Sequence, residues 1–189
     1  CNPAIGGLAK GQMVREIDVL GGKMGMFADF SGIQFKTLNK SKGRSVWSPR
    51  AQVDKRVYEK IAKKNIITNQ NIYTYSNEAT NVSPLKNNSF LVETRNGIKF
   101  TSKTVVVTCG TFLSGKIHIG DRKILAGRMG EERADGITES LQKIGLRSGK
   151  LKTGTPPRLI SKSINWKETS IESGDTNPIP FSYQTKDFN

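Results

Sequence analysis

The sequence predicts an α/β layered domain that contains a β-meander. Three observations lead to this fold class: apolar residues recur at helical spacing in the first third of the chain, strand-forming residues flank an Asn-Gly pair near position 96, and a short β-branched run follows. The 189 residues are 35% hydrophobic, enough to form a packed core. No apolar run approaches the roughly 20 residues of a membrane-spanning helix.

The first 50 residues alternate between glycine-rich, helical and extended patterns. Val14, Ile17 and Leu20 have helical spacing, and the pair Gly21-Gly22 is a typical helix end. We therefore expect a glycine-rich loop over 1–11, a helix over 14–20, one or two helical turns over 24–30, an extended segment over 33–38 and a basic loop over 39–50.

A further helix is predicted after Pro49. Val53, Val57 and Ile61 share one face, and Glu59 precedes Lys63 by four residues, a favourable ion-pair spacing. Strand-forming residues follow at 72–75. The segments 90–94 and 98–101 predict a hairpin whose Asn96-Gly97 turn is of type I′.

The run 104–108 is continuous and β-branched, which predicts a central parallel strand that buries Cys109 at its end. A last helix is expected over 136–144, capped by Asp135 and ended by Gly145. Only short strands, over 158–164, are expected in the proline- and glycine-rich remainder. The final 20 residues have no clear pattern.

The formal charge is +14, from 30 basic and 16 acidic residues. Residues 36–64 hold ten Lys or Arg against two acids, and residues 114–167 hold twelve against five. Such an excess favours a polyanionic partner, and nucleic acid is the commonest large one, although any single lysine is better explained as a solvated side chain.

The two cysteines, Cys1 and Cys109, do not form a disulfide framework and are expected to be reduced thiols. His118 has no second ligand at metal-binding spacing, so a structural role is favoured and no metal site is expected. No Ser/His/Asp pattern stands out.

Several motifs resemble, in order, those of the MnmG (GidA) family of tRNA uridine 5-carboxymethylaminomethyl modification enzymes. Together they are highly specific, whereas any one glycine pair alone would be weak. The matching blocks are residues 1–11 (CNPAIGGLAKG), 15–22 (REIDVLGG), 41–43 (SKG), 50–52 (RAQ), 110–113 (GTFL), 116–120 (KIHIG), 127–131 (GRMGE) and 151–158 (LKTGTPPR).

The resemblance implies an incomplete FAD/NAD(P)-binding Rossmann-like domain with a β-meander, followed by the start of an inserted domain. We place these at residues 1–112 and 113–189. Family members carry a Gly-x-Gly-x-x-Gly loop that holds the FAD pyrophosphate, and this chain has neither that loop nor the family's C-terminal half. The isolated fragment is therefore expected to bind FAD poorly and to be inactive.

Cys1 is the candidate catalytic residue that the resemblance implies. Addition of a thiolate to C6 of uracil makes C5 nucleophilic, so a cysteine beside the flavin suits a reaction at C5. The alternative is that Cys1 only packs near the flavin. The resemblance also implies FAD contacts at Gly6, Gly7, Ser41, Lys42, Gly43, Ala79, Thr108, Gly110, Thr111 and Ala134.

For RNA contacts, arginine can fork onto a phosphate and lysine supplies a point charge. Trp47 could stack on a base or pack internally, and some of the cations could serve FAD or folate anions instead. The predicted nucleic-acid contacts are Lys40, Arg44, Arg50, Arg128, Lys152 and Arg158.

By resemblance, the parent protein is a cytoplasmic homodimer that uses FAD, NADH and methylenetetrahydrofolate. With an MnmE-type GTPase partner it would modify C5 of the wobble uridine U34 of tRNA, without a membrane. Two alternatives remain: a flavoprotein-derived tRNA-binding module without catalysis, and the related folate- and FAD-dependent tRNA uracil methyltransferases, in which blocks 1–7 and 152–158 are not expected.

Overall fold

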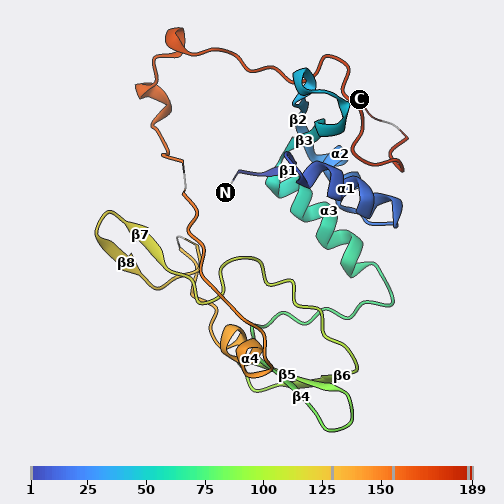
Figure 1. The fold of residues 1–189 in the computed structure, drawn as a ribbon, viewed down its shortest axis with the longest axis vertical. Helices are drawn as coiled ribbons and strands as arrows, with labels where there is room; N and C mark the ends of the chain where they lie inside the picture. The colour runs from blue at the N-terminus through green and yellow to red at the C-terminus, as the bar shows by residue number, and fades with distance from the viewer. Residues whose placement is uncertain (1, 129, 155, 187, 189) are drawn as a thin grey trace. The chain divides into compact units, whose positions relative to one another are not determined.

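The computed structural model describes residues 2–128, 130–154, 156–186 and 188. The chain forms two compact units (Figure 1). Unit 1 consists of Cys1–Thr74 and Gly154–Asn189, and unit 2 consists of Tyr75–Thr153. These units are defined by contacts within the chain, and the predicted domain boundary after residue 112 stays a prediction.

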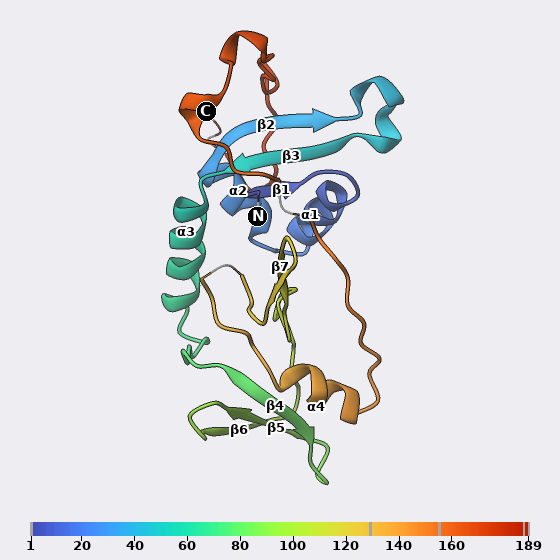
Figure 2. The same ribbon diagram turned by 90° about the vertical axis from the view of Figure 1, so that its left-hand side faces the viewer.

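Unit 1 is built on a three-stranded antiparallel sheet in the order β1-β3-β2. In Figure 2, the loop between β2 and β3 lies at one end of this strand pair and α3 begins at the other. The elements are β1 (Ala4–Gly6), α1 (Lys10–Val19), α2 (Met24–Ser31), β2 (Gly32–Leu38), η1 (Lys40–Lys42), η2 (Arg44–Val46), β3 (Ser48–Val53), α3 (Lys55–Ile67), η3 (Ser161–Ser163) and η4 (Trp166–Glu168).

The core of unit 1 lies between the sheet and the helices. Val14 of α1, Ala28 of α2 and Ala51 of β3 are buried together with Phe181, which is 2% exposed. Phe181 comes from the C-terminal part of the chain, where the sequence has no pattern. A segment 130 residues downstream of β3 therefore completes this core.

The predicted first helix, helical turns and extended segment are confirmed as α1, α2 and β2. The loop expected over 1–11 is wrong in part, because β1 occupies Ala4–Gly6 and α1 already begins at Lys10. The predicted apolar face of α1 is only partly right, because Val14 is buried while Ile17 and Leu20 are exposed. Asp18 is buried instead, at 2% exposure, because its carboxylate accepts a hydrogen bond from the C-terminal segment.

The predicted helix after Pro49 is confirmed as α3, but its start was placed too early. Val53 pairs with Gly32 and ends β3. Residues 48–50 of the loop expected over 39–50 therefore also belong to this strand. Asp54 then caps α3, because its Oδ1 accepts hydrogen bonds from the backbone N–H groups of Arg56 at 2.8 Å and Val57 at 3.1 Å. No ion pair joins Glu59 to Lys63, and both are among the described residues.

Unit 2 contains the predicted β-meander, in which β4, β5 and β6 are adjacent antiparallel strands. Helix α4 packs on β4, where the backbone N–H of Val82 donates to Ser140 Oγ at 3.2 Å. The elements are β4 (Ala79–Pro84), β5 (Phe90–Thr94), β6 (Lys99–Ser102), β7 (Ile117–Ile119), β8 (Arg122–Ile124) and α4 (Ile137–Lys143).

The hairpin between β5 and β6 is confirmed, but its turn is not of type I′. Only Gly97 has a positive φ, at 83°, whereas a type I′ turn needs two such residues. Gly97 N–H donates to Thr94 O at 2.9 Å and Thr94 N–H donates to Ile98 O at 3.0 Å. This pattern fits a three-residue loop with a glycine bulge, a common alternative for the same sequence.

Three predicted strands are wrong. Residues 72–75, 104–108 and 158–164 form no strand, and the last segment contains the 3-10 turn η3 instead. Tyr73 is 95% exposed and Val106 is 84% exposed, and Cys109 is exposed as well. A strand needs a hydrogen-bonded neighbour, and no described segment pairs with these three.

The last predicted helix is confirmed as α4, with a different cap. Gly136 precedes it with φ of 98°, and a Cβ there would lie 2.2 Å from the carbonyl oxygen of Thr80. The Glu139 carboxylate accepts the Gly136 N–H at 3.0 Å, while Asp135 pairs with Arg133 at 2.5 Å. None of the described helices is long and apolar enough to cross a bilayer.

Candidate functional site

The first candidate site lies where the glycine-rich loop meets β3. Gly6 and Gly7 have φ of 80° and 93°, and the N–H of Gly7 donates to Pro49 O at 2.9 Å. A Cβ on Gly6 would lie 2.4 Å from that same oxygen and 2.5 Å from the ring of Phe181. Glycine is therefore required there by close packing as well as by φ.

Arg50 lies against the same loop. A Cβ on Gly7 would be 3.9 Å from Arg50 Cδ. Gly7, a predicted cofactor contact, and Arg50, a predicted nucleic-acid contact, are therefore neighbours. Arg50 Nε is buried and has no hydrogen-bond partner in the part of the chain that is described. Such a donor needs an acceptor, which an ordered water or a bound group can supply. Cys1 itself lies outside the described residues.

The second candidate site is the basic loop, residues 39–47, between β2 and β3. Asn39 and Gly43 have φ of 60° and 97°, which let two short 3-10 turns follow each other. Trp47 Nε1 donates to Lys40 O at 3.2 Å, and the guanidinium of Arg44 lies 5.7 Å from the centre of the Trp47 ring. Predicted cofactor residues 41–43 are at its exposed tip.

An acidic segment that sequence reasoning missed holds this basic loop and the edge of β2. Lys36 pairs with Glu172 at 2.6 Å, and Lys40 pairs with Asp175 at 2.9 Å. Asp175 also accepts the Thr37 N–H at 2.9 Å, and its own N–H donates to Phe35 O at 2.8 Å. We call residues 172–188, whose described members cover β2, α1 and α2, the C-terminal strap.

The pKa of Asp175 reflects this environment. Burial of the carboxyl group alone would raise its pKa, but the hydrogen bonds from Lys40 and Thr37 outweigh burial and lower it. The pKa of Glu172 is also lowered, chiefly by its hydrogen bond with Lys36. Both carboxylates are thus held ionised beside the cations.

Two aspartates of the helices anchor the rest of the strap. The Asp29 carboxylate accepts three hydrogen bonds, from Phe181 N–H at 2.6 Å, Ser182 N–H at 2.9 Å and Thr185 Oγ1 at 2.6 Å. Asp18 Oδ2 accepts the N–H of Tyr183 at 2.8 Å. The only sequence signal for these roles is that Asp18 and Asp29 interrupt apolar helical stretches.

In unit 2, Ala79 and Ala134 lie in two segments that contact each other through Thr80 and Gly136. Ala134 forms a parallel bridge with Leu113, and its carbonyl accepts the Ser114 N–H at 2.8 Å. Ala79 begins β4, whose next residue, Thr80, is in close contact with Gly136. Thr108, Gly110 and Thr111 are exposed and precede Leu113, and Gly110 has φ of 67°.

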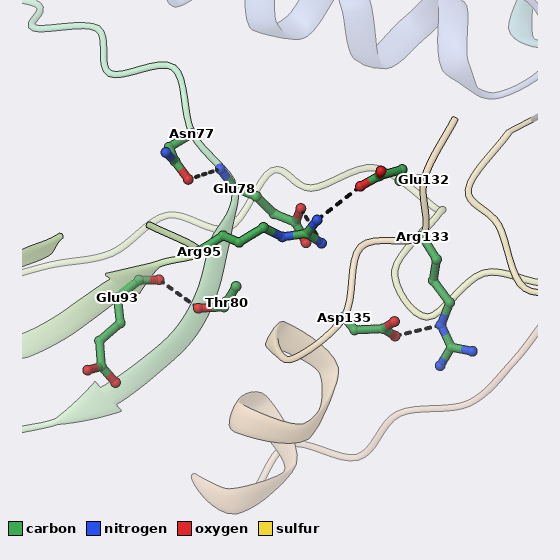
Figure 3. Close-up of polar contacts among 8 residues, drawn as sticks. All are labelled: Asn77, Glu78, Thr80, Glu93, Arg95, Glu132, Arg133 and Asp135. Carbon is green, nitrogen blue, oxygen red and sulfur yellow. Dashed lines mark hydrogen bonds and ion pairs between the residues drawn. The ribbon is translucent and has the colours of Figure 1, made fainter. Parts of the chain in front are cut away.

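Arg95 links the two segments that carry these alanines (Figure 3). It pairs with Glu78 at 2.7 Å and with Glu132 at 3.0 Å, so one guanidinium joins the start of β4 to the loop before α4. The hydrogen bond with Glu132, followed by the charge of Glu78, raises the pKa of Arg95. Arg95 was not among the predicted site residues.

The remaining predicted RNA contacts belong to both units. Arg128 is hydrogen-bonded to Glu131, with one contact from Nε at 3.0 Å. Lys152 belongs to unit 2 and Arg158 to unit 1, and both are exposed. Within the described residues, no group of three or more His, Cys, Asp or Glu side chains is placed to hold a metal ion.

The whole sequence matches one known family. The model of the family described as Glucose inhibited division protein A matches residues 1–189. The chain belongs to this family. A solved structure, Aquifex aeolicus GidA in the form I crystal, is 45% identical, covers 98% of this chain and superposes with a TM-score of 0.88. The predicted fold class is thereby confirmed, although the described strands pair only in antiparallel ladders.

Curated relatives match along almost the entire chain. The tRNA uridine 5-carboxymethylaminomethyl modification enzyme MnmG of Flavobacterium psychrophilum is 48% identical over 184 residues, and that of Thermodesulfovibrio yellowstonii is 46% identical over 189 residues. These matches cover 97% and 100% of this chain but 29% and 30% of the two relatives. The chain thus spans about 30% of their length.

Proposed function

We propose that this chain is part of a tRNA uridine 5-carboxymethylaminomethyl modification enzyme that acts at C5 of wobble uridine U34. One observation carries the proposal: relatives with that name are 46–48% identical over essentially the whole chain. At this identity, the chemistry of the parent enzymes is the best guide to the chemistry of the chain. The charge of +14 supports a polyanionic substrate independently.

We infer that FAD is the cofactor of the parent protein. The unpartnered Nε of Arg50 beside Gly7, together with two consecutive glycines at positive φ, fits a cofactor rich in acceptor oxygens and nitrogens. In this proposal residues 6–7 approach the cofactor through backbone, Ala79 and Ala134 do so in unit 2, and 41–43, 108 and 110–111 contribute exposed backbone and polar groups. The bound flavin would supply redox chemistry.

Cys1 keeps its proposed role as the nucleophile or as a flavin neighbour. The proposed assembly is a cytoplasmic homodimer with an MnmE-type GTPase partner, and the proposed co-substrates are NADH and methylenetetrahydrofolate. The proposed tRNA contacts are Lys40, Arg44, Arg50, Arg128, Lys152 and Arg158, and Arg50 serves either tRNA or, through its buried Nε, the cofactor. For Lys40 and Arg128, tRNA would have to compete with Asp175 and Glu131, because these acids already hold the two cations.

The experiment that tests this proposal uses the protein that contains this chain, unmodified tRNA and mass spectrometry of the nucleosides. The protein is expected to add a 5-carboxymethylaminomethyl or aminomethyl group to U34, and Cys1→Ser is expected to abolish it if the thiolate adds to C6. A methyl group at C5 would instead indicate the uracil methyltransferase reaction. Tight tRNA binding without any modified uridine would favour a non-catalytic RNA-binding module.

A further inference from the structure

Helix α3 carries an exposed basic face. At 100° per residue, its five cations and Glu59 lie within one half of the helix circumference, while the half-buried Tyr58, Ile61 and Ala62 occupy the other half. Tyr58 fixes this orientation, because its ring meets Phe27 edge-to-face with centroids 5.9 Å apart. We define the α3 face as Lys55, Arg56, Lys60, Lys63 and Lys64.

Among the described residues, the cations of the α3 face have no acidic partners. None of the ion pairs among the described residues includes any of the five, although Glu59 lies on the same face. Arg56, Lys60 and Lys64 follow one another at intervals of four residues, which places them in a row with steps of about 6 Å along the helix. A row of unpaired cations suits a chain of phosphates.

A hollow at the C-terminal end of α3 adds a second, chemically different feature. It has a volume of about 410 Å³ and is lined by Phe30, Ile61, Lys64, Asn65 and Thr68. The Phe30 side chain is 61% exposed, and the Asn65 amide makes no hydrogen bond within the described part of the chain. An exposed aromatic ring beside a cation and a free amide is a combination that can stack and hydrogen-bond an unpaired base.

We propose that α3 and this hollow form a contact surface for single-stranded or loop RNA, with phosphates on the α3 face and a base on Phe30. The proposal rests on the proposed function, because it identifies a surface for the tRNA substrate. The Asn65 amide beside the ring favours RNA over an anionic membrane, since an amide can hydrogen-bond the edge of a stacked base whereas acyl chains offer it no partner. The surface is separate from the basic loop, because the two lie at opposite ends of the β2–β3 pair (Figure 2).

The test is a salt titration of tRNA binding by the protein that contains this chain. The triple variant Lys60→Gln, Lys63→Gln, Lys64→Gln should weaken binding and reduce the slope of log K against log salt by about 2, or about 0.7 per phosphate contact with a single strand. Glu59→Gln should tighten binding. A charge-matched control changes Lys86, Lys103 and Lys162 to Gln; all three are exposed and should leave the slope nearly unchanged.

Phe30 provides an independent readout. Phe30→Leu should weaken binding about 5-fold to 150-fold with an unchanged salt slope, because stacking is worth about 1–3 kcal/mol and releases no counterions. Phe30→Tyr, which keeps the aromatic ring, should restore binding.

The outcomes separate this proposal from the proposed function. If the chain binds tRNA but the α3 triple variant behaves like its control, the proposal is overturned and the basic loop remains the RNA surface. If the chain binds vesicles of anionic lipid more tightly than tRNA at the same salt, the surface is a membrane contact and the proposal is also overturned. If the protein that contains this chain binds no tRNA at all, the proposed function loses its substrate.

Discussion

The basic loop and the α3 face come from one basic stretch of sequence, but their cations have different surroundings in the structure. In and beside the loop, Lys36 and Lys40 are paired with acids of the strap, and Arg44 lies over Trp47. On α3, five cations remain exposed without an acidic partner among the described residues. The comparison teaches that net charge along a sequence does not locate a binding surface, because folding neutralises part of it.

The largest effect is expected at Phe181, the core residue that anchors the acidic C-terminal strap. Phe181→Ala removes a core ring that is 2% exposed, so the free energy of unfolding of unit 1 should fall by about 3–5 kcal/mol. Urea denaturation measures this loss. Phe30→Ala, the same substitution at a ring that is 61% exposed, should cost less than about 1 kcal/mol. Equal losses would show that the strap is not part of the core.

The next largest effect is expected at Asp29. Asp29→Ala removes the acceptor of three hydrogen bonds and leaves two backbone N–H groups of the strap without a partner. The free energy of unfolding should fall by about 2–3 kcal/mol, and amide hydrogen exchange at 181–185 should accelerate. Asp121→Ala, an exposed aspartate of unit 2, serves as the control. Unchanged exchange at 181–185 in the Asp29 variant would contradict the anchoring role.

A smaller, pH-dependent effect is expected at Asp175. Its pKa in the folded chain is lower than its ordinary value of 3.8, so its stabilisation is present above that pH and is lost as the pH falls through the lowered pKa. Asp175→Asn should cost about 1 kcal/mol near pH 6, and the difference from the wild type should shrink below pH 3.8. The urea denaturation midpoints of the wild type and of Asp175→Asn are compared across pH. A difference that does not change with pH would mean that the charge of Asp175 does not contribute to stability.

The smallest effects distinguish paired from unpaired lysines. Lys40→Gln removes the ion pair with Asp175 and should lower the free energy of unfolding by about 0.5–1 kcal/mol. Lys60→Gln should change it by less than about 0.5 kcal/mol, because Lys60 has no ion-pair partner among the described residues. Thermal denaturation of both variants at low salt makes the comparison. A larger loss of unfolding free energy for Lys60→Gln than for Lys40→Gln would mean that Lys60, and not Lys40, is the paired lysine.

Local signals predicted much of the fold. The helices α1, α2, α3 and α4 and the β5–β6 hairpin follow from apolar spacing, caps and turn residues, all of which act over a few positions. The strand expected at 104–108 failed for a physical reason: a β-branched run is a strand only when another strand pairs with it. The same reason explains the failure at 72–75.

The candidate sites were less predictable. Gly6, Gly7 and Arg50 were identified through resemblance, and the structure brings them together. The roles of Asp29 and Asp175 could not be predicted, because their partners lie more than 130 residues away in sequence and no local pattern encodes such contacts. The basic face of α3 could have been found by projecting its lysines onto a helix.

Lysine reactivity tests the central claim most directly. The chain is dimethylated briefly with and without tRNA, and each lysine is quantified by mass spectrometry. In the free chain, Lys36 and Lys40 should react more slowly than Lys60, Lys63 and Lys64; tRNA at low salt should protect the three α3 lysines, and added salt should remove that protection. Equal reactivity of Lys40 and Lys60 in the free chain, or α3 lysines that tRNA does not protect, would contradict the account.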